Sequence, residues 1–494
     1  MSEDLIDKKQ NSRSTKKIIF SIICIVMIAV FVIALSPKAM QNDTFWSIKV
    51  GERLVKDGVF GIDYFSIHED LNYVAHHFLT DVVIYLVYNF FDFVGLYVLE
   101  CILALVMAGL LFYLNNLICK NKIISVVLFI LQMIVLSMYI AVRAQMFSFI
   151  LFLVEIILLE KYKGKENKWY LIALSVIPVI LANFHMGVVP FYFIILGVYG
   201  LSYIKLNFLC FETVEKTNKQ ALFKLVIVGI IGVATVFLNP YGIDGVLYPF
   251  KTFGNDFIMS TIVEFKPYNV GLDGGLILFY SVIVIFLLIL NKGKIKLNDM
   301  LIICGTLFMT FTSIRYASLF AICSAVVLRY TENIKTFFSN LKDYDMKAIY
   351  VEVLVAIILI VMRRFLLFSS EYVPENTYPI QAVEYLKENM TEDTRIFNAY
   401  EWGSYLMLND IKVYIDSRCD LYTEEYSGVT VATDYNKITG CAKDWRGLVE
   451  KYNINAFLIQ VKENESLSTL LTESTDFKEV YRDDVAVIYT KVKE

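Results

Sequence analysis

The chain has 494 residues, of which 57% are hydrophobic and 19% charged, and its mean hydropathy is +0.58. These values lie outside the range of soluble proteins and indicate a polytopic membrane protein. The 8 cysteines are scattered, so the sequence has neither a metal-binding spacing nor a disulfide framework.

Apolar runs predict about 11 transmembrane helices. The first run, from Ile18 to Ser36, has nineteen residues and is long enough to cross about 30 Å of hydrocarbon. It follows a short N-terminus, residues 1–17, and lacks the small-residue cleavage site of a signal peptide. The other runs lie at residues 94–115, 123–140, 145–160, 169–184, 187–205, 222–238, 274–291, 299–313, 316–330 and 348–366.

Residues 78–92 form a shorter apolar run that carries Asp81 and Asp92 towards its ends. We interpret this run as an interfacial or re-entrant helix. Loop charge favours eleven spans over twelve, because short cytoplasmic loops are rich in Lys and Arg. With eleven spans, the lysine-rich loops share the side of a cytoplasmic N-terminus. The transmembrane domain then covers residues 18–366, with a first outer loop at residues 37–93.

The tail, residues 372–494, is acidic, with 13 Lys plus Arg against 22 Asp plus Glu, a net charge of −9. The span count places it on the outer face, and its acidity above a basic inner face agrees with that assignment. Residues 412–416, 456–460 and 485–489 have strand composition, and residues 445–452 have helical periodicity. We therefore expect a small extracytoplasmic α/β domain.

Asp43 follows the first span closely and opens an amphipathic segment. The segment separates its residues into two helical stripes, with Lys49, Glu52, Arg53 and Lys56 on one and Trp46, Val50 and Leu54 on the other. We expect an interfacial helix that ends at Gly58. Asp43 is then a helix cap that accepts backbone hydrogen bonds, a functional carboxylate, or both.

Further unusual polar residues fall on the same outer side. They are the adjacent pair His76 and His77, the inter-span residues Arg143, His185 and Arg315, and the loop acid Glu264. Adjacent helical histidines point about 100° apart and are poor joint metal ligands. An arginine, in contrast, presents a planar fork suited to phosphate oxygens. The structural alternatives are interfacial or helix-end histidines and arginines that reach lipid head groups.

Two motifs in the tail place polar and aromatic residues after predicted strands. They contain Asn398, Trp402, Asp416, Arg418 and Asp420. Ligands usually bind at the ends of strands in open α/β sheets, so these residues are candidates for ligand contacts. An internal ion pair between Asp416 and Arg418 is the structural alternative.

The chain resembles the GT-C superfamily of polytopic glycosyltransferases, which use a polyprenyl-phosphate-linked sugar. The resemblance rests on Asp43-Thr44-Phe45-Trp46 after the first span, on Gly51 and Gly58, on Tyr64-Phe65-Ser66 and on His76-His77-Phe78-Leu79. The chain is also similar to a bacterial group of GT-C-like proteins in Arg143-Ala144-Gln145, Ala182-Asn183-Phe184-His185, Asn239-Pro240-Tyr241-Gly242, Glu264-Phe265-Lys266-Pro267 and the two tail motifs. The family often has two acids in the first outer loop, whereas here Asn42 precedes a lone Asp43.

The resemblance implies a multi-pass glycosyltransferase of the bacterial cell membrane, of hexosyl or pentosyl type. It would move a sugar from a polyprenyl-phosphate donor to an extracytoplasmic glycan, lipid or protein. It implies that Asp43 is the base of an inverting transfer, that Arg143 and Arg315 hold the donor phosphate, and that His76, His77, His185 and Glu264 make further substrate contacts. The tail would then help to select the acceptor.

We expect no resident cofactor and no nucleic-acid partner, and the lone acid weakens the case for a metal-dependent reaction. Two other classes of protein also fit eleven spans and few charges. One is a lipid or polysaccharide transporter or flippase, although transporters tend to carry repeats and ionisable groups at mid-membrane depth. The other is a non-catalytic envelope assembly protein.

Overall fold

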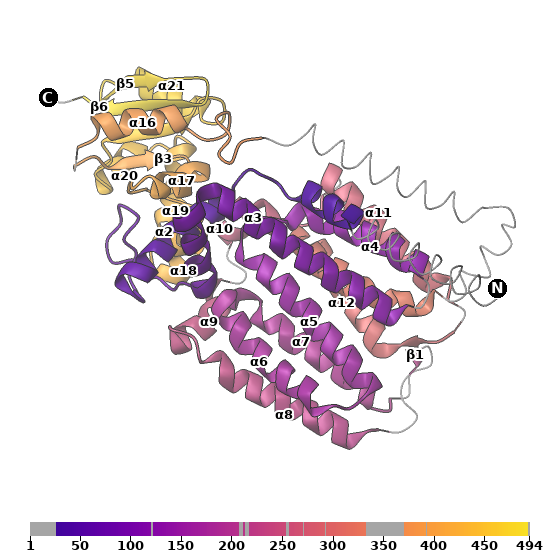
Figure 1. Cartoon of the computed structure of the whole chain (residues 1–494). Coiled ribbons are helices and arrows are strands. Elements are labelled where there is room, and N and C mark those ends of the chain that lie inside the picture. Colours follow the sequence, from indigo (N-terminus) through magenta and orange to yellow (C-terminus); the bar gives the residue numbers. More distant parts are fainter. Residues whose placement is uncertain are drawn as a thin grey trace, which may run out of the picture.

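The structure is a computed structural model in which residues 26–119, 122–206, 211–212, 217–252, 256–269, 271–291, 293–331, 370–391 and 393–492 are described. These residues form a bundle of apolar helices and, at one end of it, a small region that contains a sheet (Figure 1). The expected cytoplasmic residues 1–17 and the predicted span at residues 348–366 lie outside the described residues.

The bundle is built mainly from apolar helices. In chain order they are α3 (Phe78–Ile118), α4 (Lys122–Leu136), α5 (Ala144–Gly164), α6 (Lys168–Phe184), α7 (Val189–Gly200), α8 (Lys219–Val236), α11 (Leu272–Ile289), α12 (Leu297–Thr312) and α13 (Ala317–Cys323). Three described segments are long and apolar enough to cross a membrane, namely Phe78–Ile118, Met186–Tyr203 and Lys219–Val236. Several shorter apolar helices, such as Val26–Leu35 and Gly274–Ile289, accompany them. The predicted membrane character is thus supported, and the number of eleven spans stays a prediction.

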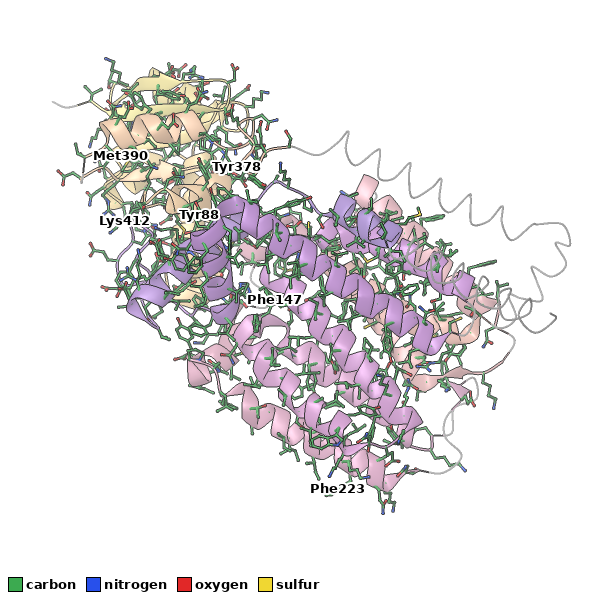
Figure 2. The ribbon with its side chains drawn as sticks, viewed as in Figure 1. Tyr88, Phe147, Phe223, Tyr378, Met390 and Lys412 are labelled. Carbon is green, nitrogen blue, oxygen red and sulfur yellow. The ribbon has the colours of Figure 1, made fainter. Side chains whose placement is uncertain are left out.

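The bundle helices bury apolar side chains on one side and expose others on the outside. Phe129, Met133 and Phe320 are buried in the core of the bundle, whereas Phe223 on α8 and Phe308 on α12 are 65% and 69% exposed. Figure 2 shows Phe223 at the edge of the bundle. Many large exposed apolar side chains would be unfavourable in water and favourable against lipid chains.

Short elements connect the bundle helices at its two ends. They include α9 (Gly242–Thr252), α10 (Asp256–Thr261) and the 3-10 turns η2 (Met186–Val188), η4 (Val263–Phe265) and η5 (Ile314–Tyr316). Two short strands, β1 (Phe211–Glu212) and β2 (Ile295–Lys296), pair in parallel. Two hydrogen bonds join the segments of η4 and η5. The backbone N–H of Ile314 donates to the carbonyl of Lys266, and the hydroxyl of Ser313 donates to the backbone carbonyl of Glu264.

The predicted boundary near residue 92 corresponds to a break in α3. Asp92 has a φ of 53° and a ψ of −159° inside this element of 41 residues, a strained conformation that residues with a side chain rarely adopt. Its carboxylate accepts a hydrogen bond from the backbone N–H of Phe93 at 2.7 Å. The break separates the segment that begins at Phe78 from the longer apolar segment that follows.

Helix α2 (Asn42–Asp57) is the amphipathic helix that the sequence predicts, and it ends at Gly58, whose φ is 81°. Trp46, Val50 and Leu54 are buried, as their helical stripe indicates. The helix packs against α3 on one side and against α17 (Gly403–Leu408) of the C-terminal region on another. It is therefore covered by protein on two sides.

The C-terminal region holds a four-stranded sheet of order β3-β4-β6-β5. Its strands are β3 (Ile396–Asn398), β4 (Ala456–Gln460), β5 (Phe477–Arg482) and β6 (Ala486–Lys491). Strands β3 and β4 are parallel, and β6 is antiparallel to both β4 and β5. The other helices of this region are α16 (Ile380–Asn389), α18 (Glu424–Ser427), α19 (Val431–Thr439), α20 (Trp445–Lys451) and α21 (Glu465–Glu473).

The prediction of a sheet strand at residues 412–416 is wrong. Val413, Tyr414 and Ile415 are buried as a strand would be, but the backbone of Val413 pairs with the first outer loop instead of the sheet. Its N–H donates to the Phe65 carbonyl at 3.1 Å, and its carbonyl accepts from the N–H of Ile67 at 2.8 Å. Apolar composition predicted the burial correctly, but it does not specify which chain segment supplies the backbone partner.

One hydrophobic core joins the first outer loop to the C-terminal region. It includes Phe45 and Trp46 of α2 together with Tyr378, Tyr405 and Trp402 of the tail. The ring of Phe45 makes edge-on contacts with Tyr378 and Tyr405, at centroid distances of 5.1 and 5.6 Å. The tail is therefore packed onto the start of α2, which fixes the surroundings of Asp43.

Candidate functional site

Asp43 lies in the first turn of α2, and its carboxylate contacts three side chains. One oxygen forms an ion pair with Arg143 at 2.7 Å. The other accepts hydrogen bonds from the Ser417 hydroxyl at 3.1 Å and from the Trp46 indole N–H at 3.3 Å. The residue at the N-cap position is Gln41, so the contacts of Asp43 with side chains, rather than a cap, account for its orientation.

Arg143 lies between two carboxylates. It occupies the turn before α5, and its guanidinium contacts Asp43 and Glu264 at 2.7 Å each. Burial alone would lower the pKa of Arg143, but the two carboxylates raise it above its ordinary value. Burial alone would raise the pKa of Glu264, whereas the charge of Arg143 lowers it. The three side chains thus form a compensated triad of residues that lie far apart in the sequence.

Three of the predicted histidines meet beside this triad. The ring of His77 stacks on Trp46 at a centroid distance of 5.7 Å and lies 4.8 Å from the ring of His185. His76 is 4.0 Å from His77 and hydrogen-bonds the Tyr248 hydroxyl at 3.1 Å. The Nδ1 atom of His185 lies 2.7 Å from the hydroxyl oxygen of Ser148 on α5.

Burial determines the charge of these histidines. It lowers the pKa of His76, of His77 and of His185 below the usual value for imidazole. For the latter two rings, the positive charges of Arg143 and Arg315 lower the pKa further. Neutral imidazoles can donate one hydrogen bond and accept another, so at neutral pH this group supplies hydrogen bonds instead of positive charge.

Arg315 supplies a second positive charge near the histidines. It lies in η5, and its guanidinium carbon is 4.3 Å from the centroid of the Phe265 ring. Among the residues that the structure describes, no carboxylate lies within ion-pair distance of this guanidinium. Its charge nevertheless acts on His77, His185 and Glu264. Arg315 is therefore the cation of the site that remains open to a ligand.

The donor set of the site suits an anion better than a metal ion. Two carboxylates, Asp43 and Glu264, are present, and the guanidinium of Arg143 occupies the space between them. Within the described ranges, no group of three or more His, Cys, Asp or Glu side chains is arranged to hold a metal ion.

Four of the five predicted tail residues lie in internal contacts. Asn398 accepts from the N–H of Tyr414 and donates to the carbonyl of Ile415, and the Trp402 indole donates to the Thr377 carbonyl. Asp416 and Arg418 form the internal ion pair of the structural alternative, at 2.7 Å. Because these side chains are buried and satisfied, the structure gives them a role in packing the tail.

Arg418 also joins the tail to the first outer loop. Its second nitrogen contacts the carboxylate of Asp63 at 2.6 Å, and all three side chains of this bridge are almost fully buried. The two carboxylates raise the pKa of Arg418 against the opposing effect of burial. The bridge Asp63–Arg418–Asp416 therefore locks residues 37–93 against the C-terminal region.

Asp420 is the tail residue that reaches the histidine group, where its charge acts on His76 and Tyr248. Three contributors to the site were not singled out from the sequence, and one of them is Ser148, the partner of His185. Tyr248 comes from α9, and Ser417 stands between two predicted residues and bonds both Asp43 and the hydroxyl of Ser404, the latter at 2.8 Å. Only its position inside a tail motif pointed to Ser417.

No protein-family model matches the sequence, and no curated protein matches it. Among solved structures, the fold is similar to that of the Archaeoglobus fulgidus oligosaccharyltransferase, crystallised in the apo form. The two structures superpose with a TM-score of 0.60 over 95% of this chain and 74% of the other, at 11% sequence identity. At this identity the likeness concerns the fold.

The comparison supports the expected GT-C-like architecture, because an oligosaccharyltransferase is a glycosyltransferase of the GT-C fold. The shared property is the fold, in which a bundle of apolar helices is accompanied by a small sheet-containing region. Membership in a particular bacterial group stays a prediction.

Proposed function

We propose that this protein is an integral-membrane glycosyltransferase that transfers a sugar from a polyprenyl-phosphate donor to an acceptor on the outer face of the membrane. The observation that carries the proposal is the convergence of Asp43, Arg143, Glu264, three histidines and Arg315 in a chain with the fold of an oligosaccharyltransferase. A reaction that separates a phosphate from a sugar needs a base and cations together.

The proposed reaction is a single displacement with inversion. The acceptor hydroxyl gives its proton to the carboxylate of Asp43, and its oxygen forms a bond to C1 of the sugar. The bond between C1 and the phosphate oxygen breaks, and its electron pair stays on the lipid phosphate. One carboxylate on the face opposite the leaving group is sufficient for this geometry, by analogy with inverting glycoside hydrolysis.

The other residues are assigned by their charge and availability. Arg315 is proposed as the main ligand of the donor phosphate, because no described carboxylate pairs with it, and Arg143 as a second ligand that also holds Asp43 and Glu264. The neutral rings of His76, His77 and His185 would donate hydrogen bonds to phosphate or sugar oxygens. Asp420 lies beside His76 and is proposed to contact the acceptor.

The test measures the transfer of radiolabelled sugar to acceptor in proteoliposomes. These contain the full-length protein, radiolabelled polyprenyl-phosphate hexoses or pentoses, and an envelope extract as the source of acceptor. We expect Asp43→Asn to lower the rate by about 10²–10⁴-fold, the usual contribution of a general base. Glu69→Gln removes an exposed acid from the same loop and should leave the rate unchanged. If wild type transfers sugar and Asp43→Asn does so equally fast, Asp43 is not the base.

A further inference from the structure

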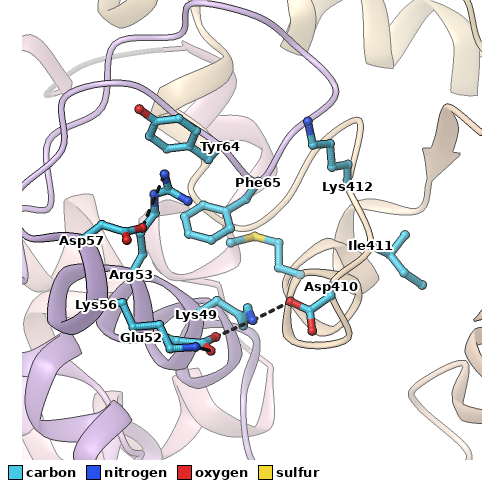
Figure 3. A pocket seen from close by; sticks show the side chains of 11 residues that line it. Lys49, Glu52, Arg53, Lys56, Asp57, Tyr64, Phe65, Asp410, Ile411 and Lys412 are labelled. Carbon is cyan, nitrogen blue, oxygen red and sulfur yellow. Dashed lines mark hydrogen bonds and ion pairs between the residues drawn. The ribbon is translucent and has the colours of Figure 1, made fainter. Parts of the chain in front are cut away.

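A pocket separate from the site of Asp43 lies between α2, the loop that follows it and the tail. It has a volume of about 310 Å³ and is lined by Lys49, Glu52, Arg53, Lys56, Asp57, Tyr64, Phe65, Met407, Asp410, Ile411 and Lys412 (Figure 3). This volume is at the lower end of the range for small-molecule sites. None of these residues takes part in the proposed sugar transfer, so the pocket requires its own explanation.

The ion pairs inside the pocket leave Lys412 without a described partner and give Arg53 one long contact. Lys49 binds both Glu52 and Asp410, and Lys56 binds the other oxygen of Glu52. Arg53 lies 3.6 Å from Asp57, which is too long for a hydrogen bond. Lys412 is exposed and has no ion-pair partner among the described residues.

The guanidinium of Arg53 contacts an aromatic ring as well as Asp57, and one of its donor atoms has no partner in the described ranges. This guanidinium lies over the ring of Tyr64, 3.5 Å from the centroid. Its Nε atom is buried and has no hydrogen-bond partner within the described part of the chain. A buried donor without a partner is unfavourable by itself, but Nε has no accessible surface for a ligand. The Arg53 side chain is 31% exposed, so a ligand in the pocket would contact its terminal nitrogens. In Figure 3, Arg53 and Lys412 lie to either side of the Phe65 ring.

The lining also limits the size and polarity of the ligand. Tyr64 is 44% exposed, and the rings of Tyr64 and Phe65 offer flat apolar faces beside the two cations. Seven of the eleven lining residues are charged, so a polyprenyl chain would remove solvent from most of them at a cost. A compact ligand with hydroxyl groups and one negative charge satisfies both the rings and the cations.

We propose that this pocket is a binding site for a sugar that carries a negatively charged group, either a carboxylate or a phosphate. The charged group would lie against Lys412, and the sugar ring would lie beside Tyr64 and Arg53. Lys49 on α2 and Asp410 in the tail form an ion pair at 2.6 Å. This ion pair closes the pocket where α2 contacts the tail. The proposal is independent of the sugar transfer assigned to Asp43, because it concerns binding at other residues.

The proposal is tested by calorimetric titration of the full-length protein in nanodiscs with glucuronate, glucose 6-phosphate, glucose and inorganic phosphate. We expect both charged sugars to bind and glucose to bind at least about tenfold more weakly. Lys412→Gln and Arg53→Gln should each weaken the charged sugars by about tenfold, as expected for a lost charged hydrogen bond. Lys478→Gln, which removes an exposed lysine on β5, is the matched control and should bind as wild type does.

The ligands distinguish the two sources of charge. Tighter binding of glucuronate identifies a carboxylate site, and tighter binding of glucose 6-phosphate identifies a phosphate site. The proposal is overturned if glucose binds as tightly as the charged sugars, or if inorganic phosphate equals glucose 6-phosphate. Failure of all four ligands to bind also overturns it. So does a result in which Lys412→Gln and Arg53→Gln both bind the charged sugars with the affinity of wild type. Lys412 is exposed, so its variant tests binding without disturbing packing.

Discussion

Ser417 connects the tail directly to the carboxylate proposed as the base. Its hydroxyl donates to Asp43, and its oxygen lies 2.8 Å from the hydroxyl of Ser404 at the start of α17. The sequence separation between Ser417 and Asp43 is 374 residues. Because Ser417 contacts the carboxylate and not the reacting atoms, we regard it as a positioning residue.

Removing this hydroxyl should affect turnover and spare binding. We expect Ser417→Ala to lower kcat for sugar transfer by about tenfold, the equivalent of one hydrogen bond to a charged group, with an unchanged KM for the donor. Ser417→Thr keeps the hydroxyl and should restore kcat, whereas Ser466→Ala, at an exposed site on α21, should resemble wild type. Equal kcat values for the Ala and Thr variants would contradict this role.

At the scale of single residues, the sequence predicted the polar residues of the membrane part better than those of the tail. Asp43, Arg143, His185 and Arg315 are conspicuous because charged or polar groups at the ends of apolar runs need a reason to be there. In the tail, polar residues are common. From the sequence, Asp416 and Arg418 are therefore equally suited to ligand contact and to an ion pair. The structure distinguishes these two roles, because Arg418 lies between Asp416 and Asp63.

At the scale of elements, the close approach of α2 to α3 depends on Gly51. A Cβ atom at residue 51 would overlap the Asp81 carbonyl oxygen and lie 2.7 Å from the Cβ of Tyr85. A larger residue there would push the two helices apart. Asp43 lies on the same helix, about 12 Å away along its axis at 1.5 Å per residue, and would move with it.

We expect Gly51→Ala to destabilise the protein by about 1–3 kcal/mol, the usual cost of overpacking. Gly109→Ala is the matched control, because a Cβ at residue 109 of α3 meets no neighbouring atom. Thermal unfolding of both variants in detergent, followed by tryptophan fluorescence, measures the difference. A melting temperature for Gly51→Ala equal to that of Gly109→Ala would show that α2 and α3 have room to separate.

Elements were predictable where their own side chains set the pattern. The stripes of α2 and the positive-φ stop at Gly58 depend on local residues, and so do the apolar runs of the bundle. The segment at residues 412–416 has a strand partner in the first outer loop, and no local pattern encodes that choice. The break at Asp92 was predictable only as the end of a short apolar run.

At the scale of the whole molecule, the buried bridge Asp63–Arg418–Asp416 holds the tail on the membrane part. We expect Arg418→Gln to destabilise this contact by about 3–5 kcal/mol, because it leaves two buried carboxylates without their cation. Limited proteolysis of the full-length protein should then cleave the tail faster than in wild type. The control is Arg482→Gln, which removes an exposed arginine paired with Glu479. Equal cleavage rates in the two variants would contradict a locking role.

The separation of these partners along the chain has a consequence for the order of assembly. Asp63 and Arg418 are 355 residues apart, so during synthesis the first outer loop emerges long before the segment that pairs with it. Contacts of such separation form late, because the intervening loop must close first. The carboxylate of Asp43 therefore acquires its Ser417 partner only after the segment that contains Ser417 has been made. Under the proposed function, a newly made protein stays inactive until its synthesis has passed Ser417.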